Sequence, residues 1–218
     1  MKANLDIVDL IGALWEAECI GLVDTDQDAT PTCPLRFSSI SLQPDGPFDV
    51  DFLRQAGHII ADATSATKAR PQFSGVFGLP GAGKALAEGF TQKWFGNLHI
   101  VPLETCGDGM KISDPDEYQY YKECTLWGIT DIVTPVLVHP HLSAVLRRPI
   151  LGYSAFIDLS AGRSAAMLAE SGMTLCACID DVSTLLAFSV SADKITSEQA
   201  FQLEADYQAF CQYMADHP

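Results

Sequence analysis

Apolar residues recur along this chain at two spacings, one typical of helices and one typical of strands. Residues 5–20 and 48–69 carry apolar side chains three and four positions apart, which predicts two amphipathic helices. Another helix is expected near the C-terminus, at 196–214. Short apolar runs bounded by polar, proline or glycine residues predict the strands. These expected strands span 35–42, 73–78, 98–102, 131–138, 153–158, 173–179 and, less regularly, 185–190.

Two of these strands are each followed by a loop of small residues, a helix and another strand. The first such unit runs from residue 73 to residue 102, and the second from 153 to 179. This order is typical of a βαβ unit, in which both strands join one parallel sheet. The sequence therefore predicts an α/β fold, a parallel sheet flanked by helices, in a single domain. We expect residues 1–47 to form an N-terminal appendage, 48–195 the core and 196–218 a C-terminal helix; over 104–149 the pattern is weaker and predicts only the strand at 131–138.

Charge narrows the class of ligand. The 218 residues include 28 acids and 13 bases, which gives a formal net charge of −15 and an isoelectric point near 4.4. Such a charge repels phosphate polymers and anionic lipid surfaces, so we expect neither a nucleic acid nor a membrane as partner. A small polyanion would need local basic residues or a magnesium ion to offset this field.

Cysteine usage and the first residues indicate the compartment. Seven cysteines, an odd number with no Cys-x-x-Cys pair, predict reduced thiols. Acidic residues interrupt the N-terminus, which argues against a signal peptide, and no apolar run approaches the roughly 18 residues that span a bilayer. We therefore expect a cytoplasmic protein.

The segment between the strand at 73–78 and the following helix is a candidate phosphate-binding loop. Glycine lets backbone N–H groups point inward without a Cβ clash, and the following helix adds its positive end. The loop consists of Gly78, Leu79, Pro80, Gly81, Ala82, Gly83 and Lys84. It matches the nucleotide-triphosphatase P-loop pattern Gly-x4-Gly-Lys, except that Ala85 replaces the magnesium-binding Ser or Thr. A glycine turn that binds no ligand is the alternative.

The same residues, written as Gly78-x-Pro80-x-x-Gly83-x-x-Leu86-Ala87, resemble the pyrophosphate loop of the orotate phosphoribosyltransferase family. The order of expected elements resembles this family over most of the chain, with residues 1–47 as an N-terminal helix and hood. The resemblance implies a phosphoribosyltransferase-type, Rossmann-like sheet that binds a small phosphorylated sugar or nucleotide. It also implies transfer of a phosphoribosyl group from phosphoribosyl pyrophosphate to a nitrogenous base, release of pyrophosphate, a Mg²⁺ ion and a homodimer.

In that family the ribose-phosphate loop follows a strand with the pattern hydrophobic-Asp-Asp-Val-x-Thr-x-Gly-x-Ser/Thr. The counterpart expected here follows the strand at 153–158, where Asp158 keeps one acid of the pair and Leu159 replaces the other. The resemblance implies that Asp158 holds ribose or magnesium and that Lys84 stabilises charge. Phosphate contacts are expected at Ser160, Ala161, Gly162, Arg163 and Ser164. Two alternatives to this placement of the ribose-phosphate loop remain. Residues 158–164 could form an ordinary turn without a ligand, or the loop could lie at Asp180-Asp181-Val182-Ser183-Thr184, which matches more letters of the pattern but lacks the glycine.

Several features of the family are absent from the sequence. No histidine lies between His99 and His139, where the family's mobile catalytic loop carries one, and Ala82 replaces the usual lysine of the pyrophosphate loop. The second hypothesis is therefore a protein that keeps the fold without turnover and serves as a nucleotide sensor or partner-binding module. Two weaker candidates are a metal site of His139 and His141 with Asp158, His99 or Cys106, and an anion contact at Arg147-Arg148.

Overall fold

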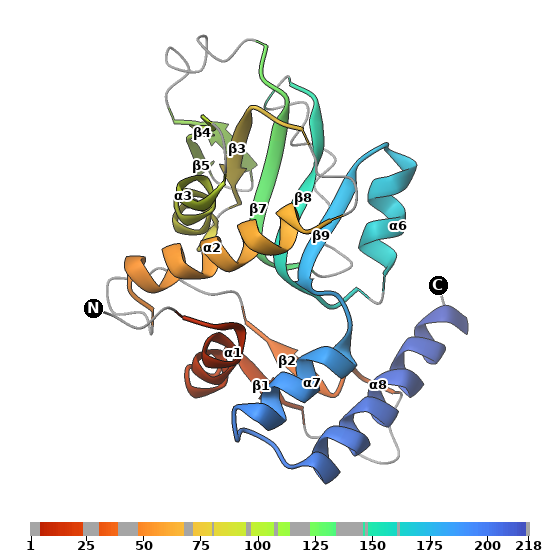
Figure 1. Ribbon diagram of the computed structural model, residues 1–218. Coiled ribbons are helices and arrows are strands. Elements are labelled where there is room, and N and C mark those ends of the chain that lie inside the picture. The colour runs from red at the N-terminus through yellow and green to blue at the C-terminus, as the bar shows by residue number, and fades with distance from the viewer. Residues whose placement is uncertain are drawn as a thin grey trace. The chain divides into compact units, whose positions relative to one another are not determined.

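The computed structural model describes residues 5–23, 31–38, 48–67, 72–79, 81–94, 97–106, 109–113, 123–133, 146, 148–160 and 162–216. The chain divides into two compact units (Figure 1). Residues 40–180 form the first, called the central unit, and residues 1–39 together with 181–218 form the second, called the terminal unit. The expected single domain, with its core over 48–195, stays a prediction.

The central unit contains a five-stranded sheet in which every strand runs parallel to its neighbours (Figure 1). The strand order is β4-β3-β7-β8-β9. These strands span Gly75–Gly78 (β3), His99–Val101 (β4), Leu126–Val133 (β7), Ile150–Asp158 (β8) and Thr174–Ile179 (β9). The predicted α/β fold with a parallel sheet is thereby confirmed. An antiparallel hairpin of β5 (Leu103–Cys106) and β6 (Gly109–Ile112) follows β4, in the stretch where the sequence predicted no element.

Helices cover both faces of this sheet, and its middle strands are accordingly buried on both sides. All eight residues of β7 are buried. On one face lies α2 (Val50–Ser65), whose Thr64 Oγ1 is 2.6 Å from Ser154 Oγ of β8, and α3 (Gly83–Lys93) packs beside α2. The preceding residue of β8, Tyr153, points to the opposite face. There it packs in a core with Phe77 and with Leu168 of α6 (Arg163–Glu170).

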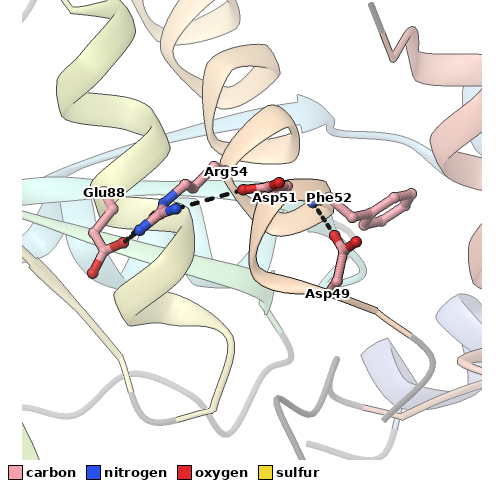
Figure 2. A network of polar contacts seen from close by, with 5 residues as sticks. All are labelled: Asp49, Asp51, Phe52, Arg54 and Glu88. Atoms are coloured by element: carbon pink, nitrogen blue, oxygen red, sulfur yellow. Dashed lines mark hydrogen bonds and ion pairs between the residues drawn. The ribbon is translucent and has the colours of Figure 1, made fainter. Parts of the chain in front are cut away.

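The two helices α2 and α3 approach so closely that their backbones touch. A Cβ added at Gly57 would lie 2.2 Å from a carbonyl oxygen of α3, and one at Gly89 would lie 2.0 Å from the carbonyl oxygen of Arg54. Figure 2 shows a salt bridge across the same contact, in which Arg54 Nη2 donates to Glu88 Oε2 at 2.7 Å. Glycine at these two positions therefore lets α3 pack directly against the backbone of α2.

In the described residues, the terminal unit consists of three helices and a two-stranded antiparallel sheet. Its elements are α1 (Ile7–Glu16), β1 (Ile20–Leu22), β2 (Leu35–Phe37), α7 (Val182–Ser191) and α8 (Ser197–Asp216). Trp15 Nε1 of α1 donates to Ser189 Oγ of α7 at 2.9 Å, and Lys194 Nζ lies 2.6 Å from Glu16 Oε1. The helices predicted at the two ends of the chain are confirmed.

The predicted strand at 185–190 is wrong, because these residues lie in α7. Asp181 accepts a hydrogen bond from the backbone N–H of Thr184 at 2.7 Å and thereby caps the helix. The buried residues of α7 then follow a helical spacing, at Val182, Leu185, Leu186 and Ser189. A short apolar run fits a buried helix as well as a strand, and here the packing of α7 against α1 and α8 selects the helix that Asp181 caps. Parts of two other predicted strands, 39–42 and 134–138, lie outside the described residues.

Candidate functional site

The glycine loop joins the end of β3 to the start of α3 with backbone in contact on both sides. Gly78 ends β3 and Gly83 begins α3. A Cβ on Gly78 would lie 2.1 Å from the carbonyl carbon and oxygen of Gly83, so no larger residue fits there without moving backbone. The N–H of Leu79 donates to the carbonyl of Ile129 in β7 at 2.9 Å, which holds the loop against the middle strand. Gly81 has a φ of 94°, a conformation that glycine adopts without strain.

The first turn of α3 suits an anion. Its N-cap residue is Ala82, which offers no side-chain hydrogen bond to the helix, and no acidic residue lies in the first turn. The N-terminal N–H groups and the positive end of the helix dipole are therefore not neutralised by a capping carboxylate or hydroxyl. Lys84 is exposed in the same turn and adds a positive charge. Pro80, another predicted member of this loop, lies outside the described residues.

The second predicted loop follows β8 and is held by its own side chains. Asp158 ends the strand, is 5% exposed and accepts a hydrogen bond through Oδ1 from the N–H of Ser160 at 2.8 Å. The Ser160 hydroxyl in turn accepts from the N–H of Ser164 at 2.9 Å, at the start of α6. Gly162 has a φ of 79°, and the N–H of Arg163 donates to the Ser160 carbonyl. These side chains stabilise the turn, and their contact with a phosphate stays a prediction. Ala161 lies outside the described residues.

The two loops lie at the same end of the sheet, where its strands have their carboxyl ends, and they flank β7. Both β3 and β8 pair with β7 in parallel, so their carboxyl ends point the same way. Two strand spacings of about 4.8 Å separate β3 from β8. Gly78 pairs with Ile129 and Asp158 pairs with Val133, so the second loop begins about 13 Å further along the strand direction. A ligand that touched both loops would therefore pass over the carboxyl end of β7, where ligands of open α/β sheets usually bind.

Sequence reasoning missed the residue that stands between the two loops, Asp131. It lies on β7 and is only 6% exposed. Its Oδ1 accepts hydrogen bonds from the N–H of Ile132 at 2.8 Å and from the hydroxyl of Thr130 at 3.2 Å. Since side chains alternate along a strand and Val133 pairs with Asp158, the carboxylates of Asp131 and Asp158 lie on the same face of the sheet. The structure thus brings together two buried acids from neighbouring strands.

The letters around Asp131 also fit the acidic pattern of the ribose-phosphate loop. Ile129-Thr130-Asp131-Ile132-Val133-Thr134 fits hydrophobic-Asp-Asp-Val-x-Thr in part: Thr130 replaces the first acid and Ile132 the valine, and the pattern's later glycine is absent. Asp131 lies on the strand directly beside that of the glycine loop, whereas Asp158 lies one strand further away. The detectable signal in the sequence was an acid inside an otherwise apolar strand.

The alternative placement at Asp180-Asp181 has a structural explanation in the described residues. Asp181 belongs to the terminal unit and caps α7. Both of its carboxylate oxygens accept hydrogen bonds from Thr184, one from the backbone N–H at 2.7 Å and one from the hydroxyl at 2.6 Å. The letters Asp-x-x-Thr therefore form a helix start at this position.

The remaining candidates stay predictions. His139, His141 and Arg147 lie outside the described residues, and within the described part of the chain no group of three or more His, Cys, Asp or Glu is arranged to hold a metal ion.

Burial raises the pKa of the Cys178 thiol to about 12, so this cysteine is protonated at neutral pH and a poor nucleophile. No described helix has both the length and the apolar character needed to cross a bilayer.

The parallel sheet flanked by helices, with the glycine loop after β3, defines an α/β protein with a phosphoribosyltransferase-type fold. Solved structures show the same fold. Leishmania donovani UMP synthase matches with a TM-score of 0.63 and 18% identity over 96% of this chain. Francisella tularensis orotate phosphoribosyltransferase matches with a TM-score of 0.57 and 12% identity over 95% of this chain and 98% of its own.

A further match is the orotate phosphoribosyltransferase of Aeropyrum pernix, with a TM-score of 0.53 and 16% identity over 82% of this chain and 96% of its own. The chain spans 42% of the length of the UMP synthase. No protein-family model and no curated protein sequence matches the chain. At these identities the likeness establishes the fold: the protein has an orotate phosphoribosyltransferase-like, type I phosphoribosyltransferase fold.

Proposed function

We propose that this protein binds phosphoribosyl pyrophosphate across the carboxyl edge of its sheet and transfers the phosphoribosyl group to a nitrogenous base, releasing pyrophosphate. The observation that carries the proposal is the uncapped first turn of α3 behind the glycine loop, on the strand next to buried Asp131. An anion-binding helix start and a carboxylate one strand away match the two chemical parts of this ligand, its phosphates and its ribose hydroxyls.

Each part of the site has a proposed role. The N–H groups of the loop and of the first turn of α3 would bind the pyrophosphate, with Lys84 adding a point charge. Asp131 would accept hydrogen bonds from ribose hydroxyls, while the turn at Asp158–Ser164 would lie at the sugar's other phosphate. Catalysis would then consist of positioning the sugar and stabilising the charge of the departing pyrophosphate.

A magnesium ion is part of the same proposal. Magnesium prefers carboxylate oxygens and is usually bound through one or two of them together with substrate phosphates. Asp131 and Asp158 provide two carboxylates on the same face of the sheet, near its carboxyl end, so these residues fit a magnesium ion. When bound, the ion would neutralise charge on the pyrophosphate.

Cytoplasmic location and a homodimer also belong to this proposal, and sedimentation equilibrium tests whether the protein is a dimer.

Calorimetric titration with phosphoribosyl pyrophosphate, with and without magnesium, tests the binding step, and a pyrophosphate-release assay over a panel of pyrimidine and purine bases tests transfer. We expect Lys84→Ala to weaken binding about tenfold or more, because a charge-assisted contact contributes roughly 1.5–3 kcal/mol. Lys93→Ala is the matched control, since Lys93 is exposed at the other end of the same helix and pairs with Asp62. Absence of binding by the wild-type protein would refute the proposal.

Two observations favour a second candidate, a protein of the same fold that binds the ligand without turnover. Thr130 stands where the family pattern has its first acid, and the chain has no histidine between His99 and His139. This protein would be a nucleotide sensor. It predicts magnesium-dependent binding of phosphoribosyl pyrophosphate with no pyrophosphate released for any base, whereas the enzyme releases pyrophosphate with at least one base. The P-loop alternative predicts instead that ATP binds and that Lys84→Ala abolishes its binding.

A further inference from the structure

The outer face of α8 differs from an ordinary solvated helix face. Its exposed residues recur at helical spacing and carry no charge over about three turns. They are Phe201, Gln202, Ala205, Gln208, Ala209 and Gln212. Phe201 is 77% exposed, more than any other large hydrophobic residue described. The opposite side of the helix packs inward through Leu203, and Ser183 of α7 donates a hydrogen bond to Glu204.

The face combines small side chains with one large aromatic ring. Alanines allow a second helix or strand to approach closely, and glutamines at the flanks can hydrogen-bond in either direction. A largely exposed aromatic side chain at one end of such an uncharged stripe is typical of the anchor of a protein interface. The composition therefore indicates packing against another polypeptide.

Charge selects the kind of polypeptide. Every charged residue of α8 is acidic: Glu198, Glu204, Asp206 and Asp216. In the whole terminal unit the only lysine and arginine residues are Lys2, Arg36 and Lys194, and the last is paired with Glu16. A second copy of this face would place acid against acid, which opposes self-association. A basic segment with an apolar stripe would complement both the charge and the exposed ring.

We propose that the outer face of α8, from Phe201 to Gln212, is a docking surface for a basic amphipathic segment of another protein. The apolar side of that segment covers Phe201 and the alanines, and its lysine or arginine residues lie beside the acids that flank the stripe. This surface is independent of the phosphate-binding loops, so the proposal stands or fails separately from the proposed function.

The test uses the full chain and a fluorescent synthetic amphipathic helix made of leucine and lysine, with binding followed by fluorescence anisotropy at about 0.15 M salt. We expect Phe201→Ala to weaken binding about tenfold, because truncating an aromatic anchor has effects of this size. Met167→Ala is the matched control, since Met167 is 47% exposed on α6 in the other unit, and its binding should stay within about twofold of wild type.

Equal binding by wild type and Phe201→Ala would overturn the proposal, because the peptide would then bind through net charge alone. Absence of peptide binding by wild type would overturn it as well. Sedimentation equilibrium measures the oligomeric state as a further test. A wild-type dimer that Phe201→Ala converts to monomer would identify a second copy of this chain as the occupant and exclude a basic partner. Far-UV circular dichroism verifies that each variant is folded. Phe201 is largely exposed, so the helix is expected to survive its truncation.

Discussion

Replacing Gly78 by alanine should damage the glycine loop more than its single added methyl suggests. A Cβ at this position would lie 2.1 Å from the carbonyl carbon and oxygen of Gly83 and 2.4 Å from the nitrogen of Lys84. Optimal contacts between carbon atoms are about 3.5–4.0 Å. The end of β3 and the start of α3 must therefore separate by more than about 1 Å. All three clashing atoms belong to the backbone, so no side-chain rotation relieves the contact.

We expect Gly78→Ala to lower the free energy of unfolding by about 3 kcal/mol, the upper end of the usual range for an overpacked interior. Urea denaturation followed by circular dichroism measures this loss. Gly172→Ala is the control. Alanine at this position is strained because φ is 72°, yet its Cβ would meet nothing within 4 Å. We therefore expect this variant to lose only the roughly 1–2 kcal/mol that a left-handed backbone conformation costs a residue with a Cβ.

The two variants should also differ in ligand binding. Gly78→Ala displaces the first turn of α3 and should abolish measurable binding of phosphoribosyl pyrophosphate by calorimetry, whereas Gly172→Ala should bind as the wild type does. If Gly78→Ala is as stable as wild type and binds the same ligand equally well, the close backbone contact at this loop is not what positions the site, and the reasoning fails.

Three other predictions follow from single residues. Asp131→Asn should weaken magnesium-dependent binding of phosphoribosyl pyrophosphate at least tenfold by calorimetry, since it removes a charged acceptor; an unchanged affinity would contradict the proposed role. Asp181→Ala should lower the free energy of unfolding by about 1 kcal/mol in urea because it removes the cap of α7, while Asp180→Ala should stay within about 0.5 kcal/mol. Burial raises the pKa of Cys178 from 9.0 to about 12, so the folded state keeps a proton that the unfolded state loses. The free energy of unfolding should therefore fall as pH rises from 9 to 12, and less so in Cys178→Ala.

Much of the fold could be predicted because its elements are locally encoded. The helices α1 and α2 have apolar residues at helical spacing and acidic N-caps, Asp6 and Asp49, that mark where each begins. The β3-loop-α3 unit was predicted because only glycine allows the turn that joins a buried strand to a helix of small residues. Each of these signals lies within about 15 residues of sequence.

The features that were missed depend on longer-range information. The apolar run Leu185–Val190 carries no period that separates helix from strand, and packing against its own unit decides. Asp131 was overlooked because its importance depends on sheet order. Only the pairing of β7 with both β3 and β8 places this acid between the two loops, and no local pattern states which strands are neighbours. The order of expected elements led instead to Asp158, and the family letters led to Asp180-Asp181.

The central claim is that a phosphorylated ribose binds at the carboxyl ends of β3 and β7. Backbone amide shifts recorded by NMR during titration with phosphoribosyl pyrophosphate and magnesium test it most directly. The account predicts that the largest shifts fall on the amides of Gly81–Lys84 and of Asp131–Val133. Shifts confined to other parts of the chain, or none at saturating ligand, would contradict it.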